Sequence, residues 1–112
     1  MKATFGEYIR QLRTGKGLTL TELAALLKLD SANLSKIDNG QREFDEKRLE
    51  KLATAFNLDI EKLKTEYFGE QFAKKMYQYN CSSETLIVAE EKVNYYKNIN
   101  VKQAKINFDN EK

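Results

Sequence analysis

The sequence predicts an all-α protein assembled from a series of short helices. Apolar residues recur every three or four positions along most of the 112-residue chain, which is the spacing that one face of an α-helix requires. No segment alternates between apolar and polar residues in the manner of a β-strand. The chain also contains no proline, so no residue forces a kink or an extended segment.

The first two predicted helices both begin with a capping box, in which a threonine is followed three residues later by a glutamate. Thr4 and Glu7 form the first box, and Thr19 and Glu22 form the second. Each box leads into an apolar stripe with helical spacing. The stripes consist of Phe5, Tyr8, Ile9 and Leu12 in the first helix, and of Leu20, Leu23, Ala24 and Leu27 in the second.

The next three predicted helices open at aspartates. Asp30 caps a short helix that stops at Asn39-Gly40, Asp45 opens a fourth helix, and Asp59 opens a fifth. Their apolar positions are Leu34 and Ile37 in the third helix, Leu49, Leu52, Ala53 and Phe56 in the fourth, and Ile60, Leu63 and Tyr67 in the fifth.

The remainder of the chain has a different character. Residues 66–79 are rich in aromatic side chains, and Gly69 leaves open whether they continue the fifth helix or form another one. A last helix is predicted from about Ser83 to Asn98, with two apolar stripes. Since a small domain covers only one stripe, we expect homodimerisation through residues 67–99, with an intramolecular cap as the alternative. The expected dimer contacts are Phe72, Met76, Val88, Tyr95 and Ile99.

The predicted organisation therefore has three parts. Residues 1–66 form a helical domain, residues 67–99 form a helical dimerisation element, and residues 100–112 form a polar tail that we expect to fray.

Two compositional features exclude the common enzyme and metal sites. The chain has no histidine and a single cysteine, Cys81, so it cannot form a Ser-His-Asp site, an imidazole-bearing metal site or an internal disulfide. Its glycines do not form a phosphate-binding loop. We therefore expect no enzyme, no metal, no cofactor and no small-molecule ligand.

The sequence also bears on compartment and charge. No apolar segment of the signal-peptide kind opens the chain, and every apolar run is far shorter than the roughly 20 residues that span a bilayer. A lone cysteine suits a reducing compartment, so we expect a cytoplasmic protein without a membrane partner. The 19 basic and 17 acidic side chains give a formal net charge of +2, which does not by itself indicate nucleic acid.

Several residues at fixed offsets match the pattern of one known family. Arg13 lies four positions before Gly17, Leu23-Ala24 form a pair, and an acid-Asn-Gly sequence occupies residues 38–40. The inward pair Leu34 and Ile37 and the later pair Leu52-Ala53 complete the pattern. On these positions, residues 5–64 resemble the Cro/C1-type (XRE-like) helix-turn-helix family of DNA-binding domains. The resemblance implies a five-helix, lambda-repressor-like domain with a recognition helix at residues 31–39.

The resemblance also implies a function and a set of contacts. It implies a sequence-specific transcriptional regulator, such as a repressor, that binds double-stranded DNA as a homodimer at a (pseudo)palindromic operator. It assigns base contacts to Ser31, Ala32, Asn33 and Lys36. It assigns contacts with the DNA backbone to Thr19, Ser35, Asn39, Gln41 and Arg42. It pairs Arg13 with Asp38 as a structural pair. Any basic DNA-facing surface must be built from Lys16, Lys28, Lys36, Arg42 and Arg48.

The chain departs from the family pattern at three places. Leu20 occupies the position of a glutamine that usually contacts phosphate, which removes one DNA contact. Lys28 occupies the position of a left-handed glycine in the turn, where a side chain costs on the order of 1 kcal/mol. Phe44 and Glu46 replace a proline and an apolar residue at the start of the fourth helix.

The biological role stays open at the level of sequence. A controller of a restriction-modification operon, an antitoxin and a phage repressor all fit the predicted domain. A protein-interaction module that has kept the fold and lost DNA binding is an alternative of a different class, which Leu20 and the modest charge favour.

Overall fold

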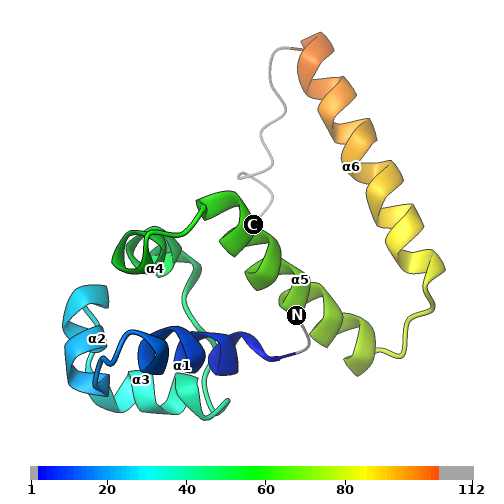
Figure 1. Ribbon diagram of the computed structural model, residues 1–112. Coiled ribbons are helices and arrows are strands. Elements are labelled where there is room, and N and C mark those ends of the chain that lie inside the picture. The colour runs from blue at the N-terminus through cyan, green and yellow to red at the C-terminus, as the bar shows by residue number, and fades with distance from the viewer. Residues whose placement is uncertain (1–2, 104–112) are drawn as a thin grey trace. The chain divides into compact units, whose positions relative to one another are not determined.

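The computed structural model describes residues 3–103, which form α-helices and one 3-10 turn but no strand (Figure 1). The all-α class is confirmed. The elements are α1 (Phe5–Gly15), α2 (Leu20–Leu27), α3 (Ser31–Asp38), the 3-10 turn η1 (Glu46–Arg48), α4 (Leu49–Phe56), α5 (Ile60–Gln78) and α6 (Glu84–Gln103).

The chain divides into two compact units, residues 1–74 and residues 75–112. The division falls within α5, eight residues beyond the domain end that the sequence predicts at residue 66. Among the residues whose burial the structure describes, 3–99, all of the buried apolar side chains belong to the first unit. The largest of those that are fully buried are Ile9, Leu23, Leu27, Leu34, Leu52 and Leu63, so every helix from α1 to α5 contributes to this core.

Local side-chain hydrogen bonds begin the first three helices where the sequence predicts. Thr4 and Glu7 form a complete capping box at α1, and Thr19 and Glu22 form one at α2. At α3, Asp30 Oδ1 accepts from the backbone N–H of Asn33 at 2.8 Å. Each cap satisfies backbone donors that the first turn of a helix leaves unpaired, so these three helices have defined starts.

Two predicted boundaries need correction, at Asp45 and at the end of the last helix, and the question that the sequence left open at Gly69 is answered. Asp45 does not open α4 but caps η1, where its carboxylate accepts from Lys47 N at 2.9 Å, and α4 begins only at Leu49. Gly69 does not interrupt α5, because one glycine costs a helix only about 1 kcal/mol relative to alanine. The last helix starts at Glu84 and continues to Gln103, so residues 100–103 are helical instead of frayed. The rest of the predicted tail lies outside the described residues.

Between residues 3 and 103, no helix is long and apolar enough to cross a bilayer.

Candidate nucleic-acid interface

The turn between α2 and α3 is tight and left-handed at one residue. Lys28 has φ 56° and ψ 52°, as its place in the pattern predicts, and Leu29 N closes the turn by donating to Ala24 O at 3.0 Å. Arg48 reaches back to this turn, where Nε donates to Leu27 O at 3.0 Å and Nη2 to Lys28 O at 2.9 Å. These bonds satisfy carbonyls that the end of α2 leaves free, so Arg48 holds the end of α2 to the start of α4.

The surface of α3 separates into an inward face and an outward face. Leu34 is fully buried and Ile37 is 3% exposed, whereas Ser31, Ala32 and Lys36 are exposed. Asn33 and Ser35 are half-buried at the border between the two faces. The outward face therefore presents short side chains at the start of the helix and one cation a turn later, which is the arrangement that a major groove accommodates.

Close packing against α1 sets the position of α3. A Cβ atom at Gly6 would lie 2.2 Å from the carbonyl oxygen of Ile37, so only glycine permits the approach of these two helices. Gly6 was not among the predicted site residues, because the need for it arises only when the two helices are brought together.

A buried ion pair joins the same two helices. Arg13 Nη2 lies 2.9 Å from Asp38 Oδ2, and Arg13 Nη1 donates to Leu18 O at 3.1 Å. The Asp38 side chain is 3% exposed, and the more exposed Arg10 lies 3.7 Å from the same carboxylate oxygen. Because a buried carboxylate without a partner is costly, this network fixes the end of α3 against α1.

The Asn33 side chain lies between two charged groups. Its Nδ2 donates to Asp30 Oδ2 at 2.9 Å, and its Oδ1 accepts from Arg42 Nη1 at 2.8 Å. The structure thus connects two residues to which the family pattern assigns different contacts, with bases for Asn33 and with the DNA backbone for Arg42. Asp30 completes the group and is absent from the predicted site residues.

The other residues assigned to the DNA backbone differ in their surroundings. Thr19 and Gln41 are exposed, although the Thr19 hydroxyl oxygen already accepts the capping hydrogen bond of α2, and Ser35 is half-buried. Asn39 is exposed and its Oδ1 accepts from Arg10. Of the candidate cations, Lys16 Nζ donates to Ala55 O at 3.0 Å. Lys16, like Arg48, therefore stabilises the fold.

A chain of polar contacts connects the loop after α3 to α5. Lys74 donates to Glu43 at 2.9 Å and lies 3.5 Å from Glu70, whose carboxylate accepts from Phe5 N at 2.6 Å. The hydrogen bond from Lys74 lowers the pKa of Glu43, and the same bond raises the pKa of Lys74. Nearby, burial raises the pKa of Tyr67, whose hydroxyl donates to Phe44 O at 2.7 Å. The loop that carries Arg42 is therefore tied to α5.

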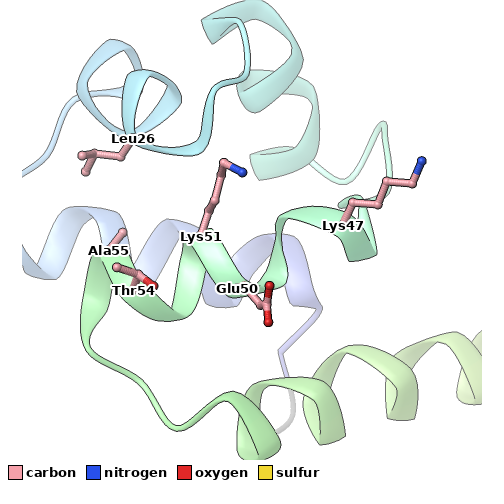
Figure 2. A pocket seen from close by; sticks show the side chains of 6 residues that line it. All are labelled: Leu26, Lys47, Glu50, Lys51, Thr54 and Ala55. Carbon is pink, nitrogen blue, oxygen red and sulfur yellow. The ribbon is translucent and has the colours of Figure 1, made fainter.

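A shallow groove between α2 and α4 contains none of the predicted site residues. Figure 2 shows Leu26 from α2 facing side chains of η1 and α4 across it. The lining residues are Leu26, Lys47, Glu50, Lys51, Thr54 and Ala55. The groove carries both basic and acidic side chains, so its charge does not favour an anionic or a cationic ligand. In the part of the chain that the structure describes, no three His, Cys, Asp or Glu side chains are placed to hold a metal ion.

The expected dimer contacts are placed on α5 and α6. Phe72 is 59% exposed, Val88 is 46% exposed and Tyr95 is 61% exposed, whereas Met76 and Ile99 are half-buried. Further exposed apolar side chains on α6 are Leu86, Ile87 and Val93.

Comparisons with known proteins match this chain to helix-turn-helix domains and to regulators. A family model described as a helix-turn-helix domain matches residues 6–68. The uncharacterized HTH-type transcriptional regulator RghRB of Bacillus subtilis (strain 168) is 37% identical over 60 residues, which are 53% of this chain and 43% of RghRB. The chain thus spans less than half the length of that relative.

Solved structures of regulators also match. The restriction-modification controller protein C.AhdI of Aeromonas hydrophila is 39% identical, with a TM-score of 0.48, over 53% of this chain and 89% of that chain. The clp gene regulator ClgR of Corynebacterium glutamicum is 24% identical, with a TM-score of 0.48, over 69% of this chain and 90% of that chain.

Proposed function

The chain belongs to the XRE-like helix-turn-helix domain family, and on that premise we propose that it is a sequence-specific DNA-binding transcriptional regulator that acts as a homodimer. The division of α3 into two faces carries the proposal. Leu34 and Ile37 anchor the helix in the core, and Ser31, Ala32 and Lys36 face solvent, free to enter a major groove.

The outward residues of α3 have chemistry that suits the edges of bases. Lys36 can donate to guanine O6 or N7, Asn33 can pair with adenine N6 and N7, and the Ala32 methyl can contact a thymine methyl. Ser31 can donate or accept at either kind of base pair. We assign these four residues to base contacts.

Contacts with the DNA backbone set the register of the helix in the groove. We assign them to Thr19 at the start of α2, to Ser35 within α3, and to Asn39, Gln41 and Arg42 after the end of α3. Since Lys16 and Arg48 bind carbonyls of the fold, few cations are left for phosphate. We therefore expect a shallower dependence of binding on salt than that of strongly basic DNA-binding proteins.

Pairing of two copies would supply the contacts that one short recognition helix lacks. Two recognition helices read half-sites about 34 Å apart on one face of the duplex, which implies a (pseudo)palindromic operator. Exposed Val88 and Tyr95 on α6, together with Phe72 on α5, provide apolar surface for such pairing. We therefore propose residues 67–99 as the dimerisation element. The compartment that we propose for this regulator is the cytoplasm.

Sedimentation of the full chain tests the dimer. We expect a dimer at micromolar concentration, and we expect Tyr95→Glu to shift it toward monomer. Leu26→Gln is the matched control, because Leu26 is 52% exposed but lies on α2, so this variant should stay dimeric. A monomeric wild-type chain would contradict the dimer.

A DNA-binding comparison tests the recognition helix. Lys36→Ala should weaken binding to the selected operator and leave binding to unrelated duplex nearly unchanged, since base contacts carry specificity and phosphate contacts do not. Equal loss on both duplexes would refute base reading by Lys36. Binding of neither duplex by the wild-type chain would favour a protein-interaction module that has lost DNA binding.

A further inference from the structure

Three side chains share hydrogen bonds beside α3: Asp30 and Asn33 lie at the start of the helix, and Arg42 reaches Asn33 from the loop that follows the helix. The role that we assign to them rests on the proposed DNA binding. We propose that Asp30 and Arg42 are positioning residues that hold the Asn33 amide in the orientation that reads adenine. Base preference at one operator position then depends on all three residues.

Asp30 performs two tasks with its two carboxylate oxygens. Oδ1 accepts from the backbone N–H of Asn33 at 2.8 Å and so caps α3, while Oδ2 accepts from Asn33 Nδ2 at 2.9 Å. The cap needs only one oxygen, which serine also supplies. The second oxygen is therefore available to act on the Asn33 side chain alone, and the two tasks can be separated by substitution.

The charges of the two neighbours determine which way the Asn33 amide points. A carboxylate can only accept hydrogen bonds and a guanidinium can only donate them. The amide nitrogen must therefore face Asp30 and the amide oxygen must face Arg42, because the flipped amide would oppose two donors on one side and two acceptors on the other. Both bonds involve a charged group and are stronger than neutral ones.

The amide retains the groups that an adenine requires. A primary amide has two N–H donors and two acceptor lone pairs on its oxygen. Asp30 uses one donor and Arg42 uses one acceptor site, so one donor and one acceptor site are left. Adenine needs one of each, because its N6 amino group donates and its N7 accepts. Asn33 can then bind adenine without breaking its hydrogen bonds to Asp30 and Arg42. Because its side chain is already ordered, the entropic cost of DNA binding is lower.

Arg42 then acts differently from a residue that only binds phosphate. A pure phosphate ligand would contribute equally on every DNA sequence. A residue that orients Asn33 contributes mainly where an adenine is read. The guanidinium has five N–H donors, so a phosphate contact can coexist with the bond to Asn33.

The test begins with an operator selected by the wild-type full chain from random duplexes. Asn33→Ala should relax preference at one A·T position by about tenfold, within the range for a bidentate base contact. Replacing that adenine with 7-deazaadenine, which lacks N7, should weaken the wild type and leave Asn33→Ala unaffected.

Asp30→Ser and Arg42→Ala should relax preference at the same position, and Arg42→Lys, which keeps one donor, should restore part of it. Asp30→Ser keeps the helix cap, so an unchanged urea midpoint separates its effect from unfolding. Adding Asn33→Ala to Asp30→Ser should cause little further loss, because both act through one amide.

Three outcomes would overturn the proposal. If Arg42→Ala weakens all duplexes equally and lowers the salt slope by about 1, Arg42 is a phosphate ligand only. If Asn33→Ala changes preference but Asp30→Ser and Arg42→Ala do not, the two charged residues have no positioning role. If no sequence is enriched by the wild-type chain, the proposed function itself fails together with this inference.

A second inference, which rests on the proposed homodimer, comes from the distribution of charge along α6. Glu84, Glu90 and Glu91 are the only charged residues in its first eight positions, and Lys92 and Lys97 are the only ones in the next eight. We propose that α6 pairs with α6 of a second copy in antiparallel orientation.

Antiparallel pairing places each acidic half against the basic half of the other copy. Parallel pairing would place Glu90 near Glu90 and Lys97 near Lys97, which is repulsive. The helix dipole accounts for an acid in the first turn, such as Glu84, but Glu90 and Glu91 lie beyond its short reach. The exposed apolar residues Leu86 and Val93 lie in the two oppositely charged halves and share one face of α6 with Glu90 and Lys97. Val88 and Tyr95 lie on the opposite face of this helix, so the contact between the two α6 helices is separate from the contacts expected of those two residues.

The single native cysteine makes the orientation measurable in the full chain. Cys81 lies three residues before α6, a helix of 20 residues and thus about 30 Å long. Spin labels on Cys81 should be about 30 Å or more apart in the antiparallel dimer. In a parallel dimer, with the two helix axes 8–10 Å apart, the labels would lie within about 20 Å of each other.

A charge exchange provides a second test of the orientation. Glu90→Lys alone should weaken the dimer, and adding Lys97→Glu should restore it. Short label distances would overturn the orientation alone, and a monomer would overturn the dimer as well.

Discussion

Replacing Lys28 with glycine is expected to stabilise the folded domain. Lys28 adopts φ 56° and ψ 52° at the end of α2, a conformation in which the Cβ atom of an L-residue crowds the backbone. Glycine has no Cβ and enters this region without that cost. The Lys28 carbonyl, which accepts from Arg48 at 2.9 Å, would be retained in the variant.

The magnitude follows from two opposing terms. The left-handed conformation costs a residue with a side chain about 1–2 kcal/mol. Glycine gives back about 0.5–1 kcal/mol of this through the greater freedom of the unfolded chain. The net gain is about 0.5–1 kcal/mol, which at a urea m-value of about 1 kcal/mol/M raises the midpoint by roughly 0.5–1 M.

Urea unfolding followed by circular dichroism provides the assay. Lys28→Ala is the matched control, since alanine loses the lysine side chain but keeps the Cβ, so its midpoint should not rise as that of Lys28→Gly does. Asn57 has nearly the same conformation at the end of α4, and asparagine tolerates it better, so Asn57→Gly should gain less. An unchanged or lower midpoint for Lys28→Gly would refute the account of this turn.

Three further predictions concern the contacts that position α3 and the loop that follows it. Gly6→Ala should lower the stability of the domain by about 1–3 kcal/mol, because its Cβ would overlap a backbone carbonyl of α3, and the urea midpoint will show this. Arg13→Ala should cost about 3 kcal/mol or more by leaving the Asp38 carboxylate buried without its nearest cation, whereas Arg13→Lys should recover part of the loss. Glu43→Gln should lower the urea midpoint slightly at pH 7, where the Glu43 carboxylate is charged and bonded to Lys74. Because its pKa is lowered from 4.5, this contribution is present above that value and disappears as the pH falls through the folded-state pKa, so wild type and variant should converge at acid pH below the folded-state pKa. Midpoints that differ equally at both pH values would contradict the role assigned to this pair.

The starts of α1, α2 and α3 were predictable because local chemistry determines them. A capping residue bonds a backbone N–H within three residues, and an apolar stripe needs only helical spacing, so a short stretch of sequence contains both signals. The left-handed conformation of Lys28 was predictable for a different reason, because the family pattern has a glycine at this position of the turn.

The parts that sequence analysis missed depend on contacts between distant residues. The need for glycine at residue 6 appears only when α1 and α3 pack, and Arg48 acts on carbonyls 20 and 21 positions earlier. Arg42 bonds to Asn33 nine positions away, and no local rule indicates that pairing. The length of α6 was underestimated because polar residues after Ile99 suggested fraying, although polar residues also form helices.

Titration of the full chain with its selected operator and with an unrelated duplex tests the central claim most directly. If α3 reads bases, wild-type chain should bind the operator at least about 10³-fold more tightly than unrelated DNA at physiological salt. Lys36→Ala should reduce that ratio by about tenfold through loss of operator binding alone. A wild-type ratio near one, or the same loss on both duplexes, would contradict sequence reading by α3.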